Sequence, residues 1–233
     1  MSYIILNGIK STQINGLMIQ QLAPITKPLM RTSVEEIDGR DGDIVTKLGY
    51  SAYNKEITIG LYDEYDVDEV IQYFASEGTV TFSNEFDKYY NYQILEQIDL
   101  EKLIRFKTAK VVFHVQPFKY SAVDGVVRLS NFSPKPTQLE IFNNGNTFSK
   151  PIISIIGNGV VSLSINGETA ISAVVDGYIT LDVPNMEATK DNVLVNRNVT
   201  GDYDDLVFKQ GKNILTWNGN VTDILIRQYS RWI

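Results

Sequence analysis

The chain has 233 residues, of which 43% are hydrophobic, and this is enough for a sizeable core or for two small domains. Cysteine is absent, which excludes disulfides and Cys-based metal sites and suits assembly in a reducing cytosol. The single histidine, His114, excludes a two-histidine metal site, so we expect no metal and no cofactor. No apolar run approaches the roughly 20 residues that a membrane span needs, and the N-terminus is typical of a strand start, so we expect no membrane insertion.

The formal net charge of −7 is unevenly placed along the chain. Residues 1–125 contain 12 Lys or Arg against 18 Asp or Glu, whereas residues 126–233 contain 9 against 10. Phosphate binding needs clustered cations, so the acidic first half argues against a surface that grips nucleic acid. It is compatible with a channel through which DNA passes without being bound.

Asn-Gly or Asp-Gly pairs occur ten times, mostly between short runs rich in Val, Ile, Tyr, Phe and Thr. Such pairs favour tight turns, so the chain is predicted to be mainly antiparallel β. The first expected strands are residues 3–6 and 17–22. Residues 31–50 follow, with two Asp-Gly pairs around Arg40 and apolar residues on both sides, which predicts a long hairpin arm.

One segment departs from the β pattern. Asp66 and Glu69 form a capping box, and apolar residues recur at helical spacing from Val67 to Phe74, which predicts one helix that Gly78 ends. The acidic residues at the start of this helix could suggest a calcium site, but they lack the glycine and the ligand spacing of an EF-hand. A favourable interaction of these acidic side chains with the helix dipole explains them better. Further strands are expected at residues 56–61, 79–82, 89–98 and 104–115.

The composition shifts around residues 121–136, where Asp124-Gly125 and two prolines cannot extend a central strand. We therefore predict two domains, residues 1–125 and 126–233. The second half predicts short strands with turns every 8–12 residues, a pattern typical of a β-sandwich. These strands are residues 138–142, 152–156, 160–165, 169–174, 178–183, 213–217 and 221–227, with a loop at 184–205.

The order of these elements is specific, although each motif alone is a common turn signal. The Gly-Arg-Asp-Gly arm precedes the capped helix, and the first domain closes with Phe113 to Tyr120, a Phe-x4-Pro-Phe-x-Tyr pattern. The second domain has Asn-Asn-Gly-Asn at 143–146, Ser-Lys-Pro at 149–151, Gly-Lys-Asn-Ile-Leu-Thr-Trp at 211–217 and a final Tyr-Ser-Arg-Trp-Ile. Over nearly its whole length the chain resembles the distal tail protein (Dit) family of long-tailed (siphovirus) bacteriophages and prophages.

The resemblance implies a structural protein of the virion tail tip, made in the host bacterial cytoplasm. It implies an α+β N-terminal domain that forms a homo-hexameric ring around a DNA channel, followed by a C-terminal galectin-like β-sandwich. The implied partners are the tail tube protein, the tail-associated hub protein and, in some phages, receptor-binding proteins. The chain is too short to hold the large carbohydrate-binding insertions of some family members, so it resembles the compact form.

A hairpin arm can extend a sheet across a subunit boundary, because an exposed strand edge is a template for pairing. We therefore expect the arm to lie at the ring interface, where Arg31 and Arg40 would pair with carboxylates of a neighbouring copy. The expected interface residues are Arg31, Glu35, Glu36, Asp38, Gly39, Arg40, Asp41 and Gly42.

Two other functions are compatible with parts of the sequence. The alternative is a lectin-like module for the host cell wall, in which Tyr178, Tyr203, Trp217 and Trp232 would stack on sugar, although a core role explains Trp217 more simply. An enzyme is not expected: neighbouring acids such as Glu35 and Glu36 point to opposite faces of a strand and make no facing acid/base couple. The acidic residues at 202–205 are expected to be solvated loop charges and not metal ligands.

Overall fold

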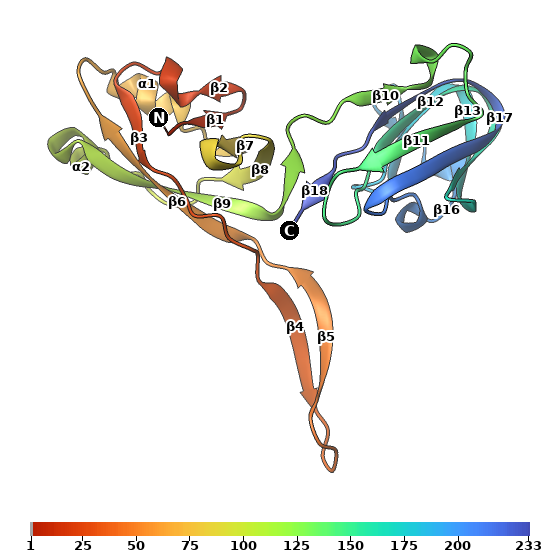
Figure 1. Cartoon of the computed structure of the whole chain (residues 1–233), viewed down its shortest axis with the longest axis horizontal. Coiled ribbons are helices and arrows are strands. Elements are labelled where there is room, and N and C mark those ends of the chain that lie inside the picture. Colours follow the sequence, from red (N-terminus) through yellow and green to blue (C-terminus); the bar gives the residue numbers. More distant parts are fainter. Residues whose placement is uncertain (1) are drawn as a thin grey trace. The chain divides into compact units, whose positions relative to one another are not determined.

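The structure is a computed structural model that describes residues 2–233, and the chain forms two units (Figure 1). The first unit ends at Ala122 and the second runs from Val123 to Trp232. Both are β-rich, which confirms the predicted fold class. The division into independent domains at residues 125 and 126 remains a prediction.

The first unit is an antiparallel sheet with the strand order β2-β1-β7-β8-β9-β6-β3. Alternate residues of its strands are buried, as Val111, Phe113 and Val115 in β9 are, so one face carries the core. Both helices of the unit contribute side chains to this core, including Val70 and Leu103. The strands are β1 (Ile4–Leu6), β2 (Ile9–Lys10), β3 (Leu17–Gln21), β6 (Tyr53–Leu61), β7 (Glu77–Phe82), β8 (Lys88–Gln93) and β9 (Thr108–Ser121).

The helix start predicted at Asp66 is confirmed in α1 (Val67–Tyr73). The Asp66 carboxylate accepts hydrogen bonds from the backbone N–H groups of Asp68 and Glu69, at 2.9 and 3.4 Å, which satisfies donors that the first turn leaves free. The predicted end at Gly78 is wrong. Gly78 lies in β7 at φ +145°, where a Cβ atom would sit 1.9 Å from the Asn7 side chain, so close approach explains this glycine.

A second helix, α2 (Leu100–Phe106), replaces the start of the strand that was predicted from residue 104. Its N-cap is Asp99, whose side chain accepts from the Lys102 N–H at 2.8 Å, and Lys107 ends it in the left-handed conformation. Leu103 is fully buried, so one side of this short helix covers the core. The prediction of a single helix was therefore incomplete.

The second unit is one sheet that folds over on itself to form a β-sandwich. The long strand β12 pairs with β13 and β17 in both of its halves, whereas β13 and β17 each have a further neighbour that differs between their two halves. Near its N-terminal end β17 pairs with β11, and near its C-terminal end with β10; β13 pairs likewise with β16 and then β14. The strands are β10 (Val126–Arg128), β11 (Gln138–Asn143), β12 (Ile152–Ile165), β13 (Glu168–Asp182), β14 (Glu187–Lys190), β15 (Val193–Leu194), β16 (Val199–Gly201) and β17 (Gly211–Arg227).

Three of the predicted turns lie inside these long strands. The Asn-Gly and Asp-Gly pairs that begin at Asn158, Asp176 and Asn218 lie in the middle of β12, β13 and β17. The three pairs are close together in the register of these strands, and the pairing of β12 with β17 is bulged there. Glycine at positive φ bends a strand here without ending it. Strands predicted as separate, such as 152–156 and 160–165, are thus single elements.

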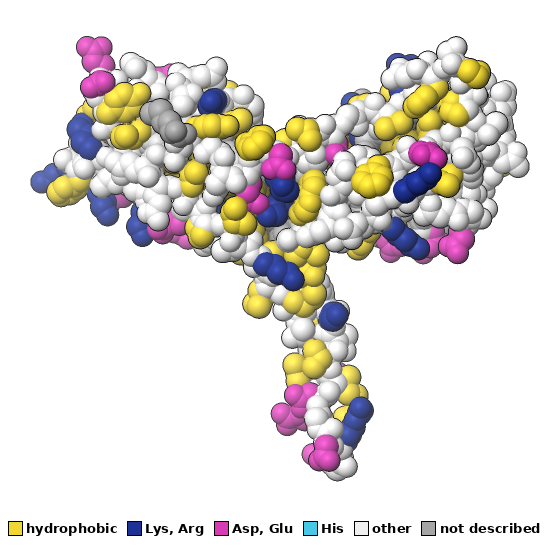
Figure 2. All heavy atoms as spheres, viewed as in Figure 1, with side chains coloured by type: hydrophobic (Ala, Val, Ile, Leu, Met, Phe, Trp, Pro, Cys, Tyr) yellow, Lys and Arg dark blue, Asp and Glu magenta, His cyan; other side chains and the backbone are white. Residues whose placement is uncertain are grey.

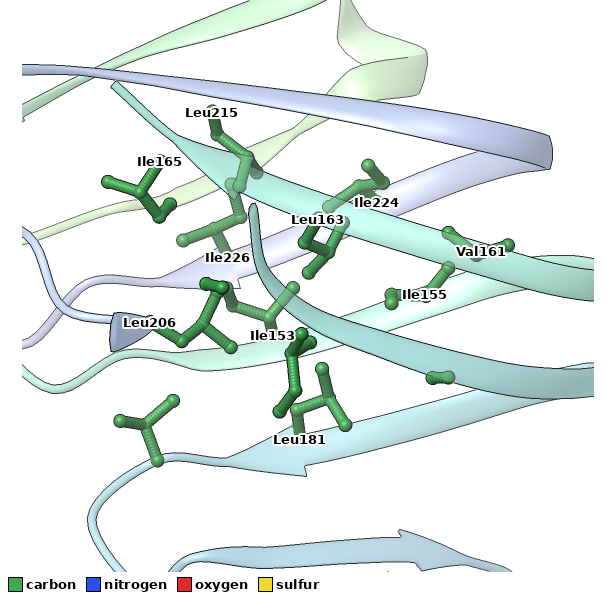
Figure 3. Packing of buried hydrophobic residues seen from close by; sticks show 14 of the residues in the cluster. Ile153, Ile155, Val161, Leu163, Ile165, Leu181, Leu206, Leu215, Ile224 and Ile226 are labelled. Atoms are coloured by element: carbon green, nitrogen blue, oxygen red, sulfur yellow. The ribbon is translucent and has the colours of Figure 1, made fainter. Parts of the chain in front are cut away.

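The bend lets both halves of one strand contribute to one core. Ile155 before the bend in β12 and Leu163 after it belong to the same buried cluster, as Figure 3 shows. Leu215 and Ile224 do the same on β17. The segment predicted as a loop at 184–205 also differs, because it contains β14, β15 and β16 with two 3-10 turns, η4 (Asn196–Asn198) and η5 (Tyr203–Asp205).

The bend supports a prediction about Gly219. Its φ is +113° and a Cβ atom would lie 2.3 Å from the Val160 carbonyl oxygen, so Gly219→Ala is expected to lower the free energy of unfolding by about 3 kcal/mol or more. Gly177, at φ +77° with nothing within 4 Å of its Cβ position, is the matched control and is expected to lose about 1 kcal/mol as Gly177→Ala. Urea denaturation measures both; equal losses would contradict the assignment of Gly219 to a close backbone contact.

Candidate assembly interface

The predicted arm is a hairpin of β4 (Met30–Glu36) and β5 (Asp43–Tyr50), which form a two-stranded sheet of their own. Val34 pairs with Val45, and a bulge between Arg31 and Thr32 leaves Leu48 as an extra residue on β5. Figure 1 shows the hairpin running away from β3 and β6, the strands that flank it in the chain. The hairpin prediction is therefore confirmed.

The arm buries almost none of its apolar side chains. Every residue from Val34 to Leu48 is exposed. The register of the two strands places Val34 and Val45 on one face and Ile44 on the other. Figure 2 shows apolar side chains along the side of the hairpin that faces the viewer. An isolated two-stranded hairpin is marginally stable in water, because it cannot bury enough surface to offset the entropy of ordering it. Contiguous exposed apolar surface is typical of an interaction site. The exposed apolar residues are Val34 (53%), Ile37 (45%), Ile44 (36%), Val45 (57%) and Leu48 (56%).

The tip of the arm is acidic. Residues 35–43 contain five carboxylates and one cation, Arg40, and Glu36 lies directly opposite Asp43 in the ladder. Like charges opposite each other in a sheet are destabilising. Within residues 2–233, neither Arg31 nor Arg40 forms an ion pair. The tip thus presents charges of both signs that are available to a partner.

All eight residues predicted for the ring interface lie in this arm. Arg31, Glu35 and Glu36 belong to β4, and Asp38 to Gly42 form the loop between the strands. Gly39 and Gly42 have φ of +81° and +78°, which confirms the conformation expected of the two Asp-Gly pairs. Their contact with another copy stays a prediction.

The segment between β3 and β4, residues 22–29, forms the root of the arm and is fixed to the sheet through its backbone carbonyls. The Lys55 ammonium donates to the Pro24 carbonyl at 2.8 Å, and the Tyr53 hydroxyl donates to the Thr26 carbonyl at 3.5 Å. Asn84 donates to the Ala23 carbonyl at 3.1 Å. Side chains of β6 and of the 3-10 turn η2 (Ser83–Glu85) therefore fix where the arm begins.

Lys55 is the least expected of these donors, because its side chain is only 2% exposed. Its Nζ lies over the rings of Tyr90 and Phe82, at 5.0 and 5.4 Å from their centroids. Burial lowers the pKa of Lys55 to about 8; the nearby Glu85 carboxylate raises it and the Lys119 ammonium lowers it further. Removing a cation from water costs folding free energy, so stability alone does not explain a buried lysine at the root of the arm.

Glu85 completes the charged cluster below the root. Its carboxylate is 8% exposed, accepts a hydrogen bond from the Tyr90 hydroxyl at 2.6 Å and pairs with Lys119. Burial raises the pKa of Tyr90, and the hydrogen bond to Glu85 adds to the effect. The cluster thus holds two ammonium groups, one carboxylate and a neutral phenol.

Sequence reasoning missed this cluster, although one signal was present. Lys55 alternates with Ile57 and Ile59, and this period of two places it on the buried face of β6. No sequence pattern near Lys55 predicts its partners, because Glu85 and Lys119 follow 30 and 64 residues later in the chain.

The four residues of the lectin alternative do not form one stacking surface. Trp217 and Tyr203 pack against the buried core of the sandwich. Tyr178 lies on the opposite side of its strand from the buried Ile179, and its hydroxyl donates to the Asp191 carboxylate at 2.9 Å. Trp232, in β18 (Arg231–Trp232), is half-buried.

No catalytic constellation is evident among the candidate acids. Glu35 and Glu36 occupy successive, exposed positions of β4, so their side chains point to opposite faces. Asp204 pairs with Lys150 at 3.0 Å, and the His114 Nδ1 atom lies 2.9 Å from the Asn54 amide oxygen. In the part of the chain that the structure describes, no group of three or more acidic or histidine side chains could hold a metal ion, and no helix could span a membrane.

The two units and the arm give the chain a β-rich architecture that can be compared with known folds. The sequence matches no protein-family model and no curated protein. The fold is similar to that of the SPP1 Dit protein (gp 19.1), with 12% identity, a TM-score of 0.65 and 97% of each chain covered. It is also similar to a component of the phage P2 baseplate in its activated conformation, with 10% identity, a TM-score of 0.50 and 99% of each chain covered. The resemblance to Dit is therefore confirmed for the fold.

Proposed function

We propose that this protein is a structural distal tail protein, of which six copies form a ring at the tip of a siphovirus tail. The ring joins the tail tube to the tail-associated hub protein and the receptor-binding apparatus. The observation that carries the proposal is a projecting arm with exposed apolar side chains on a Dit-like fold. The SPP1 protein is described as a paradigm of the hub adsorption apparatus in phages that infect Gram-positive bacteria, which supports the same role here.

The arm is the proposed ring-forming element. In a ring, one surface of each copy meets a different surface of the next copy, so a single repeated contact closes the assembly. A projecting hairpin with exposed apolar residues on both faces and free charges at its tip suits this use. Arg31 and Arg40 would pair with carboxylates of the neighbour, and the acidic tip would meet a basic surface.

The charge of the first half supports a passage for DNA that does not bind it. Residues 1–125 carry 18 acidic against 12 basic residues, and a channel wall of that balance repels the phosphate backbone. The protein would need no catalytic activity for this role. A lectin function is not proposed, because no observation brings its stacking residues together.

Negative-stain images of the purified protein test the proposal. Six-fold rings with a central hole are expected. The images are recorded for the protein alone and for the protein mixed with the matching tail tube protein, which supplies the surface on which a ring would assemble. Monomers under both conditions would contradict the proposal.

A further inference from the structure

The root of the arm exposes a short apolar strip that its anchoring bonds do not use. Ile25 and Leu29 are 58% and 74% exposed, and the exposed Lys27 lies between them at two-residue spacing, whereas Pro28 is buried. Thr26 is exposed as well, so the exposed surface of the root runs from Ile25 to Lys27 and continues at Leu29. We call Ile25, Lys27 and Leu29 the root strip.

The root strip is presented in a fixed conformation. Lys55 and Tyr53 bind the Pro24 and Thr26 carbonyls, and the Ser51 N–H donates to the Leu29 carbonyl at 2.9 Å. A segment already ordered loses little conformational entropy when it binds, so preorganisation favours association.

The first unit also contains an apolar groove, which we call the α1 groove. It has a volume of about 280 Å³ and lies between α1 and the segment that leads into α2. Its one charged lining residue is Glu96, and Ile71 on its wall is 42% exposed. The groove is lined by Val70, Ile71, Phe74, Ser76, Ile94, Glu96, Ile98 and Leu100.

We propose that the root strip of one copy docks in the α1 groove of a second copy. Ile25 and Leu29 would enter the groove, and Lys27 would face Glu96. This inference rests on the proposed ring and names a contact between neighbouring copies that acts together with that of the arm.

Charge and apolar character favour a second copy of this chain as the occupant. Residues 22–34 contain two cations, Lys27 and Arg31, and no acidic residue, whereas the only charge that lines the groove is negative. Both surfaces are apolar, lie in the same unit and differ from each other, as the repeated contact of a ring requires. A salt bridge at the rim of an apolar contact would fix its register.

A charge exchange in the full chain tests the contact. Lys27→Glu and Glu96→Lys are each expected to weaken self-association about tenfold, since each places like charges together. The double variant, Lys27→Glu with Glu96→Lys, is expected to recover association to within about threefold of the original protein. Lys102→Glu, an exposed site on α2 outside the groove lining, is the control and is expected to change nothing. Sedimentation velocity over a concentration series gives the affinities.

A second variant keeps the test independent of charge. The chain has no cysteine, so Leu29→Cys with Ile71→Cys is expected to form a disulfide between copies under mild oxidation. Assembly of the original protein with no such disulfide and no recovery in the double charge variant would overturn the root-strip contact and leave the ring proposal standing. A protein that does not assemble even with the matching tail tube protein present would overturn both.

Discussion

Replacing Lys55 with Met is expected to keep or raise the free energy of unfolding at pH 7, by up to roughly 3 kcal/mol, while it loosens the root of the arm. The buried ammonium has a pKa of about 8 against 10.5 for a free lysine, so its charge costs stability in the folded state. Methionine fills similar space without that cost. The Pro24 carbonyl loses its donor, and amide hydrogen exchange at residues 22–29 is expected to become faster.

The lowered pKa of Lys55 also predicts how the free energy of unfolding depends on pH. Between about pH 8 and 10.5 the folded protein has released the Lys55 proton and the unfolded chain still holds it, so the unfolded state binds more protons and stability rises with pH. Below pH 8 both states are protonated and the full cost remains. Lys55→Met is expected to lack this rise. Phenols with raised pKa, such as that of Tyr90, act in the opposite direction above about pH 10, so the comparison belongs between pH 7 and 10.

Urea denaturation at several pH values, with hydrogen exchange at pH 7, measures both effects. The control is Lys110→Met on β9, because Lys110 is exposed and forms only a surface ion pair with Glu56. A loss of more than about 2 kcal/mol for Lys55→Met at pH 7, or unchanged exchange at the root, would contradict a positioning role.

The parts of the fold that the sequence predicted depend on interactions within a few residues. The Asp66 cap acts on N–H groups two and three positions away, and the Asp-Gly pairs at residues 38–42 connect strands that are neighbours in the chain. Local chemistry decides such features, so the pattern is sufficient. The same holds for the exposed position of every residue expected at the interface.

The parts that were missed depend on residues far apart in the chain. An Asn-Gly pair has the same conformational freedom in a turn and in a bent strand, and only the alignment of β12, β13 and β17 decides which forms at Asn158. The partners of Lys55 come from η2 (Ser83–Glu85) and β9, so no local pattern joins them. Sequence reasoning therefore found the arm and missed what holds its root.

Shortening the arm is expected to abolish assembly and to leave the fold of each unit intact. Residues 34–45 would be replaced by Asn-Gly, a two-residue turn that closes the hairpin at the paired Ser33 and Thr46. The change removes seven of the eight predicted interface residues and four of the five exposed apolar residues of the arm, all except Leu48. Since none of the removed residues belongs to a buried core, the unfolding transition is expected to stay where it is.

A control variant changes exposed apolar residues elsewhere. Val193→Ser with Leu194→Ser alters an edge strand of the second unit, where the side chains are 62% and 59% exposed. This variant is expected to assemble like the original protein. It separates a specific role of the arm from a general effect of surface hydrophobicity.

Multi-angle light scattering of the original, shortened and control proteins, each with the matching tail tube protein present, is the most direct test that the arm joins copies of this chain. Beyond the mass of the tail tube protein, we expect the mass of six copies for the original and control proteins and of a single copy for the shortened arm. A six-copy mass for the shortened arm would contradict this role of the arm.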